Sequence, residues 1–179
     1  MMAPRTTFPT EAEVQQLEHG AFDFCITAPP LHKPGIASIS LLTEDIVLAL
    51  PLGHRLAERT CIRLVEVADE AFLSLKPGHS LRELTDAFCL QAGFTPKIVF
   101  ESDDASTIRG LIRAGQGIAF VPAISWRGST GPAVAHVQIE EPVCQRTIGL
   151  SWLEHRYLSL AARQFRQFVS DYFARLSLE

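Results

Sequence analysis

Between Phe100 and Pro122 the sequence predicts a strand, a helix, a glycine turn and a second strand, all within twenty-three residues. These closely spaced signals constrain the fold more than any other part of the chain. Ser102 or Asp103 is a candidate N-cap, because a short polar side chain can accept a hydrogen bond from the free N–H groups of a first helical turn. Apolar residues then recur at helical spacing, which indicates an amphipathic helix: Ile108, Leu111 and Ile112.

Two glycines mark the end of this helix and the return to a strand. Gly115 stands where a left-handed residue ends a helix, and Gly117 allows a tight return. The apolar run from Ile118 to Val121 is typical of a strand buried on both faces, and Pro122 ends it. A strand, a helix and a strand joined so closely predict a parallel crossover unit, in which ligands gather at the carboxyl ends of the strands.

Composition limits the classes of protein that fit. The chain has 179 residues, of which 47% are hydrophobic and 20% charged, enough for one ordinary domain or two small lobes. The net charge is −4 at pH 7, and no segment has the basic excess of a nucleic-acid-binding surface. No apolar run reaches the ~18–20 residues of a membrane span, and the first residues lack the apolar core of a signal peptide. We therefore expect a cytoplasmic globular protein with no membrane partner.

The sequence lacks the usual marks of metal, redox or catalytic chemistry. Its four cysteines are far apart and form no C-x-x-C pair, which favours reduced thiols over a metal site or a disulfide framework. The motifs G-x-S-x-G and H-E-x-x-H and the P-loop are also missing from the sequence. We therefore expect no catalytic residue, no metal, no cofactor and no enzymatic activity. The cysteines are Cys25, Cys61, Cys89 and Cys144.

The N-terminal region predicts a short helix and then a strand. Thr10 and Glu13 have the spacing of a capping box, and Gly20 ends the helix. Apolar and polar residues alternate over 21–28, which indicates a strand. Two further apolar, β-rich segments follow at 36–42 and 45–50.

A second polar loop joins a buried strand over 72–75 to another helix. Ser80 and Glu83 have the spacing of a capping box for that helix. The loop Lys76–Ser80 brings backbone N–H groups, the positive end of a helix dipole and a lysine to one strand end, and this arrangement can bind an anion without a catalytic group. The alternative is that Ser80 only caps its helix. The predicted apolar face of the helix contains Leu81, Leu84 and Phe88.

The C-terminal tail predicts a long helix, after short strands at 134–139 and 147–152. Apolar residues recur at helical spacing and arginines lie between them, so we interpret the apolar face as part of the core and not as a cofactor site. The apolar residues are Phe165, Phe168, Val169, Tyr172, Phe173 and Leu176.

Four segments resemble, in order, the effector-binding domain of LysR-type transcriptional regulators. The segment 100–122 is similar to the family pattern E-x-D-x-x-x-x-x-x-L-(V/I)-x-x-G-x-G-(I/V)-(A/G)-x-(V/L)-P. Its matching residues are Glu101, Asp103, Leu111, Ile112, Gly115, Gly117, Ile118, Ala119, Val121 and Pro122. The other segments are EVQQLEHGAFDFCITAPP, PLGHRLA and AGFTPKIVFE, with matches that include Leu17, Gly20, Asp23, Ile26, His54, Leu56 and Ala57. We assign His54 no chemistry.

The resemblance implies an α/β fold with two lobes of the type 2 periplasmic-binding-protein kind, each a small, mostly parallel sheet flanked by helices. Residues 1–58 and 138–179 would form lobe I, with its N-terminal part incomplete, and residues 59–137 would form lobe II. Regulators of this family are homo-oligomers that bind DNA through a helix-turn-helix domain. That domain, and the first strand and helix of lobe I, have no counterpart in this sequence, so we expect a truncated effector module that does not bind DNA.

The resemblance further implies that the chain senses a small-molecule effector in a cleft between the lobes. The loop Lys76–Ser80 favours an anionic effector, whereas the carboxylate of Asp103 would repel an anion and can instead cap its helix or select a polar group. The candidate effector-binding residues stand at helix starts and strand ends: Thr10, Thr27, Lys76, Pro77, Gly78, His79, Ser80, Ser102, Asp103 and Pro122.

Two other functions remain compatible with a two-lobed fold of this kind. One is an α/β enzyme in which His79, Asp103 and Asp104 converge as acid and base. The other is a solute-binding protein of a transporter, which would need an export signal that the sequence does not display.

Overall fold

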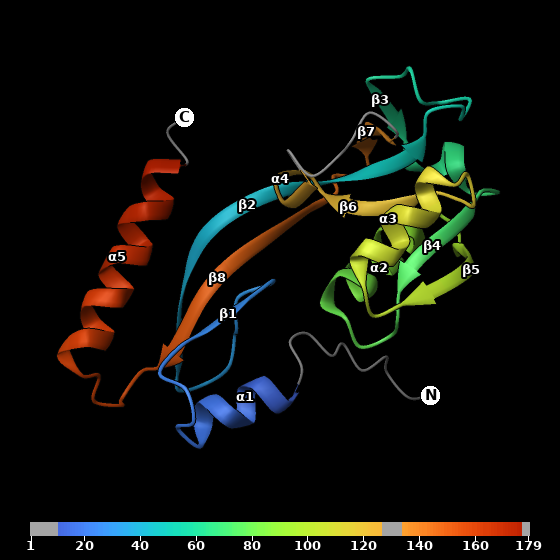
Figure 1. Cartoon of the computed structure of the whole chain (residues 1–179). Coiled ribbons are helices and arrows are strands. Elements are labelled where there is room, and N and C mark those ends of the chain that lie inside the picture. Colours follow the sequence, from blue (N-terminus) through green and yellow to red (C-terminus); the bar gives the residue numbers. More distant parts are fainter. Residues whose placement is uncertain (1–10, 127–133, 177–179) are drawn as a thin grey trace. The chain divides into compact units, whose positions relative to one another are not determined.

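The computed structural model describes residues 11–126 and 134–176, which form an α/β fold. The chain divides into two compact units: unit 1 comprises Met1–Thr43 and Arg146–Glu179, and unit 2 comprises Glu44–Gln145. Unit 2 is thus an insertion within unit 1. The chain passes between the units in two long strands, β2 (Ile36–Pro51) and β8 (Gln145–Leu153), which Figure 1 shows. These crossings differ from the lobe boundaries expected at residues 58 and 137, and which segments move together as lobes stays a prediction.

Unit 1 combines strands with a helix near each end of the chain. Its helices are α1 (Glu11–Glu18) and α5 (Leu160–Leu176). Strand β1 (Cys25–Thr27) pairs antiparallel with β8, and β8 neighbours β2 in the sheet. The strand predicted over 21–28 is therefore much shorter than expected. Two small clusters form the core: Val14, Leu17 and Leu31, and separately Leu41, Leu150 and Val169.

Helix α5 contradicts part of the sequence prediction. Val169 is buried against the sheet and Phe173 packs beside it, as expected. Phe165, Phe168, Tyr172 and Leu176 are exposed, so their assignment to the core was wrong. Helical spacing identifies an apolar face, but the width of that face is greater than the strip that the sheet covers.

Unit 2 contains the predicted parallel crossover. Strands β4 (Ala71–Leu75) and β5 (Lys97–Ser102) pair in parallel, and helix α3 (Ala105–Arg113) leads from β5 to β6 (Ala119–Pro122). Strand β6 returns beside β4, where Ile118 bridges Phe72 in parallel. Its other edge pairs antiparallel with β2. Helix α2 (Ser80–Gln91) connects β4 to β5.

The remaining elements of unit 2 complete its sheet. Strand β3 (Cys61–Arg63) pairs in parallel with β7 (Val134–Glu141), and β7 pairs antiparallel with β2. A 3-10 helix, η1 (Leu64–Val67), follows β3, and α4 (Ala123–Trp126) follows β6. No helix in the described ranges is long and apolar enough to cross a membrane.

The C-terminal half of β2 is buried on both faces. Ile46, Leu48 and Leu50 enter a cluster that includes Phe72 and Phe88, whereas Val47 and Ala49 enter a second cluster around α3. Because successive side chains of a strand point to opposite faces, one strand supplies both cores of unit 2.

Gly117 lies where the backbone leading into β6 passes close to the start of β4. A Cβ at Gly117 would lie 2.5 Å from the carbonyl oxygen of Ala71, which already accepts a hydrogen bond from Ile118 N at 2.9 Å. We expect Gly117→Ala to lower the free energy of unfolding by about 2 kcal/mol, since backbone must move to admit the methyl group. Urea denaturation measures the change. Gly53→Ala is the control, because a Cβ there meets nothing within 4 Å, and equal stability of the two variants would contradict this prediction.

Candidate functional site

The polar loops that follow β4 and β5 start from the same edge of the sheet. Leu75, the last residue of β4, lies opposite Ser102, the last residue of β5. The backbone N–H of Lys76 then donates a hydrogen bond to the carbonyl of Ser102 at 3.1 Å. The register of one parallel pair therefore brings together the loops in which the sequence predicted ligand-binding residues.

Asp103 contacts both basic side chains of this loop pair, Lys76 and His79. Its carboxylate accepts a hydrogen bond from the Lys76 ammonium and lies 3.3 Å from Nε2 of His79. The hydrogen bonds from Lys76 and then His79 lower the pKa of the Asp103 carboxyl, and the same carboxylate raises the pKa of Lys76. Because Lys76 and Asp103 are exposed, water screens this ion pair strongly.

The N-terminus of α2 lacks a side-chain cap. The helix begins at Ser80, and His79 occupies the N-cap position in an extended conformation without a capping hydrogen bond. The predicted capping box of Ser80 and Glu83 is therefore wrong. In the part of the chain that the structure describes, Oε2 of Glu83 is buried without a hydrogen-bond partner, and burial followed by the charge of Asp86 raises the pKa of this carboxyl.

The N-terminus of α3 is closed by Asp104, one residue beyond the predicted cap. Its carboxylate accepts hydrogen bonds from the backbone N–H groups of Ser106 at 3.1 Å and Thr107 at 2.9 Å. The hydroxyl groups of Ser106 and Thr107 also donate to it, and these bonds lower the pKa of Asp104. Ser102 supports the turn by accepting a hydrogen bond from Asp104 N at 3.1 Å. Two helix N-termini thus follow adjacent strands, and of these two only that of α3 has a side-chain cap.

The other predicted residues are placed as follows. Pro77 and Gly78 lie exposed in the same loop, and Gly78 has a φ of 97°. Pro122 is buried at the end of β6, opposite Ile46 of β2. Thr27 belongs to unit 1, where its hydroxyl donates to the carbonyl of Pro29 at 2.8 Å. Thr10 lies outside the described residues. A shared ligand for all ten candidates stays a prediction.

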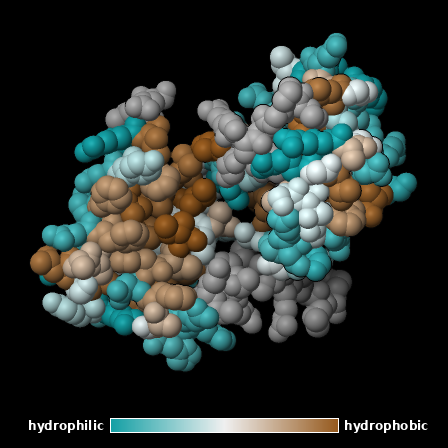
Figure 2. Space-filling view, in the orientation of Figure 1, coloured by the Kyte–Doolittle hydropathy of each residue, from teal (hydrophilic) through white to brown (hydrophobic). Residues whose placement is uncertain are grey.

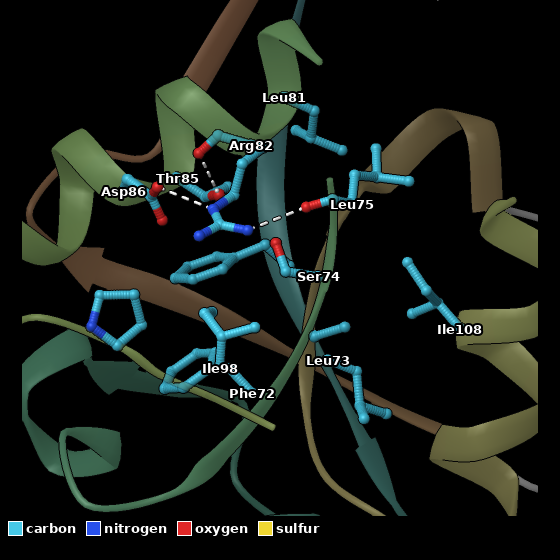
Figure 3. Close-up of a pocket in the computed structure, with 13 residues that line it drawn as sticks. Phe72, Leu73, Ser74, Leu75, Leu81, Arg82, Thr85, Asp86, Ile98 and Ile108 are labelled. Carbon is cyan, nitrogen blue, oxygen red and sulfur yellow. Dashed lines mark hydrogen bonds and ion pairs between the residues drawn. The ribbon is translucent and has the colours of Figure 1, made fainter. Parts of the chain in front are cut away.

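A cavity of unit 2 lies beside these loops and contains a residue that the sequence reasoning missed. Figure 3 shows Arg82 of α2 extending its guanidinium toward β4. The lining of the cavity is mainly apolar, with Arg82, Asp86, Ser74 and Thr85 as its polar members. Its apolar members are Phe72, Leu73, Leu75, Leu81, Pro96, Ile98, Ile108, Ala119 and Phe120.

Arg82 fastens the first turn of α2 to the ends of β4 and β5. Its guanidinium donates to the Leu75 carbonyl at 3.0 Å and to the carboxylates of Asp86, at 2.7 Å, and Glu101. Burial alone would lower the pKa of Arg82, but the hydrogen bonds that Arg82 donates to Glu101 and Asp86 outweigh it and the net pKa is raised. The four-residue spacing of Arg82 and Asp86 was the available sequence signal, because such pairs meet on a helix.

This arrangement does not favour the acid–base enzyme. Asp103 and Asp104 both have lowered pKa values, so both carboxyl groups are held ionised and neither is suited to donate a proton. Within the described residues no group of three or more His, Cys, Asp or Glu side chains could hold a metal ion.

Comparison with known proteins adds independent information. Residues 6–174 match the family model of the LysR substrate binding domain. The chain is 34% identical over 161 residues to the HTH-type transcriptional regulator YybE of Bacillus subtilis (strain 168), covering 90% of this chain and 54% of YybE. It is 30% identical over 164 residues to the transcriptional dual regulator GltC of the same organism, covering 91% of this chain and 55% of GltC. The chain thus spans about half the length of the curated relatives it matches.

Solved structures agree with this assignment. The effector-binding domain of QuiR in complex with shikimate superposes with a TM-score of 0.81 at 26% sequence identity, covering 93% of this chain and 79% of that one. The reduced form of OxyR superposes with a TM-score of 0.75 at 28% identity, covering 94% of this chain and 78% of that one.

The N-cap of α3 gives a prediction with a defined pH dependence. Asp104→Ala should lower the midpoint of urea unfolding at pH 7, because two backbone N–H groups lose their acceptor. The folded-state pKa of Asp104 lies below its unfolded value, so this stabilisation is full above about pH 4 and is lost as the pH falls through the folded-state pKa. The difference between variant and parent should therefore shrink in acid. Asp103→Ala is the matched control, and a larger loss from that change would show that the cap is misassigned.

Proposed function

The chain belongs to the LysR substrate binding domain family, and from this premise we propose that it is the effector-sensing part of a bacterial transcriptional regulator. The relatives that it matches over half their length are regulators by name, which supports the proposal. Contact with DNA would then require a helix-turn-helix domain. The module itself would act by binding and would carry out no reaction on its ligand.

The main support for the proposed site is the N-terminus of α2, which has no side-chain cap and lies beside Lys76. Backbone N–H groups and the helix dipole favour negative charge at such a position, and Lys76 adds a full positive charge. The effector would be a small anion whose carboxylate or similar group approaches Ser80. The shikimate bound to the effector-binding domain of QuiR is a small carboxylate, which makes this class a reasonable first choice.

Asp103 would act as an internal competitor for the effector. It already neutralises Lys76 and approaches His79, so an incoming anion must displace it from one or both. Because the ion pairs are exposed and screened, exchange should be easy for an anion that also reaches the N–H groups of α2. Once displaced, Asp103 could turn to a hydroxyl group of the ligand.

Arg82 would position the site without contacting the ligand's charge. Its guanidinium is largely buried and already holds Leu75, Asp86 and Glu101, so it fixes the first turn of α2 against the strand ends. A signal additionally requires that the effector bind two conformations of the chain with unequal affinity. Such a difference shifts the population of conformations, and the rest of a regulator could read that shift.

Calorimetric titration with shikimate and a panel of small carboxylates tests the site. Lys76→Met should weaken binding of the best ligand by about tenfold or more, since a charge-assisted hydrogen bond is lost. Ser80→Trp should weaken it further by filling the space before α2. Lys97→Met is the matched control, because Lys97 is an exposed lysine at the opposite end of β5 and should bind like the parent.

Asp103→Asn distinguishes an anionic effector from a cationic or neutral one. Removing the competing charge should tighten binding of an anion, whereas a ligand that uses Asp103 directly would bind more weakly. If both Lys76→Met and Ser80→Trp bind as tightly as the parent while remaining folded, the effector binds elsewhere in the chain. If no carboxylate binds the parent, the anionic class is wrong.

A further inference from the structure

Unit 2 contains a second groove, which shares no lining residue with the cavity beside Arg82. The volume of this groove is about 310 Å³, whereas that of the cavity beside Arg82 is about 30 Å³. Three parts of unit 2 meet there: the end of β3 with the start of η1, the C-terminus of α2, and the turn after β7. A groove of this size can hold a small ligand. Its lining residues are Arg63, Val65, Gln91, Ala92, Glu141 and Pro142.

Two lining residues carry opposite charges. Arg63 lies opposite Glu141 in the parallel register of β3 and β7. Among the residues that the structure describes, neither side chain makes an ion pair. A direct pair between two such exposed groups would be screened by water, so it would compete only weakly with a ligand. Because neighbouring strands lie about 4.8 Å apart, a ligand that uses both residues must carry its own two charges close together.

The end of α2 also favours positive charge in the groove. Gln91 is the last residue of the helix and Ala92 is its C-cap. Carbonyl groups at a helix C-terminus, together with the helix dipole, attract cations, and the last turn of α2 contains no basic residue. The end of α2 and Glu141 therefore both favour an ammonium group, which leaves Arg63 to bind a carboxylate.

The remaining lining residues, Val65, Ala92 and Pro142, are apolar. Val65 is 48% exposed, and the apolar residues Leu90 and Val143, next to the lining in sequence, are exposed as well. Figure 2 shows polar and apolar residues interspersed over the face of unit 2 that is in view, and not one broad apolar surface. A small molecule with charged groups and a hydrocarbon side chain fits such a lining better than a protein partner does.

We propose that this groove binds a free α-amino acid with an aliphatic side chain. The ligand carboxylate accepts hydrogen bonds from the Arg63 guanidinium, and its ammonium group donates to the Glu141 carboxylate and to carbonyl groups at the end of α2. The Gln91 amide supplies a neutral donor and acceptor, and the aliphatic side chain lies on the apolar lining. An α-amino acid meets the spacing requirement because both charged groups are attached to one carbon. The groove is separate from the proposed effector site, since the two share no residue.

Titration of the isotope-labelled full chain with leucine, followed by NMR, tests this site. Leucine should shift the backbone amide signals of the lining residues in a saturable way. Arg63→Met and Glu141→Gln should each raise the dissociation constant about tenfold, because each removes a charge-assisted hydrogen bond. Arg59→Met is the matched control, since Arg59 is an exposed arginine outside the groove and its variant should bind like the parent.

Two analogues of leucine separate the roles of the two charges. Isocaproate lacks the ammonium group and isoamylamine lacks the carboxylate, so both should bind more weakly than leucine. Arg63→Met should weaken isocaproate binding and leave that of isoamylamine unchanged, and Glu141→Gln should do the reverse. Lys76→Met should leave leucine binding unchanged, which distinguishes this groove from the proposed effector site.

Circular dichroism and urea unfolding establish that each variant is folded. The proposal is overturned if leucine shifts none of the lining amide signals, or if both analogues bind as tightly as leucine. It is also overturned if Arg63→Met and Glu141→Gln bind leucine like the parent, or if Lys76→Met weakens leucine binding. None of these outcomes contradicts the proposed effector site, which is tested with other ligands and other variants.

Discussion

Unit 2 depends on the burial of one strand segment on both faces. The C-terminal half of β2 pairs along its two edges with β6 and β7, and its side chains alternate between two apolar clusters. A register shift of one residue would exchange the side chains that enter each cluster. This constraint fixes β6, and through the Phe72–Ile118 bridge it fixes β4 and the parallel partner β5. The ends of β4 and β5, where the candidate site lies, are therefore held by the core.

A small number of polar contacts connect the candidate site to the strand ends that the core holds in place. Arg82 joins α2 to the ends of both strands, and the Lys76 backbone joins the two exits directly. The charged groups beyond them are exposed and weakly held, as in the contacts of Asp103 with Lys76 and His79. The backbone at the ends of β4 and β5 is held in place, whereas the exposed side chains beyond it can change partners. Such an arrangement is compatible with ligand binding, because backbone donors keep their positions while side chains rearrange.

The sequence predicted those features of the fold that are determined locally. Gly115 and Gly117 have the positive φ values that their positions in the motif required, and the predicted strands β4, β5 and β6 are present. Helix caps were displaced by one residue because Ser102, Asp103 and Asp104 are chemically similar, and only the turn geometry selects Asp104. The exposure of Phe168 could not be predicted, since helical periodicity contains no information on whether another element covers the apolar side. Arg82 was missed because its importance depends on Glu101, which is distant in sequence.

The two helix N-termini of the site differ in a way that local stability alone does not explain. The sequence contains the residues for a capping box on α2, and closing it would satisfy free N–H groups. Glu83 instead has a buried oxygen without a hydrogen-bond partner among the described residues, an arrangement that raises its pKa. Helix α3 nearby shows that this chain can cap a helix with one aspartate. The N-terminus of α2 therefore keeps backbone N–H groups without a side-chain acceptor, in contrast to that of α3.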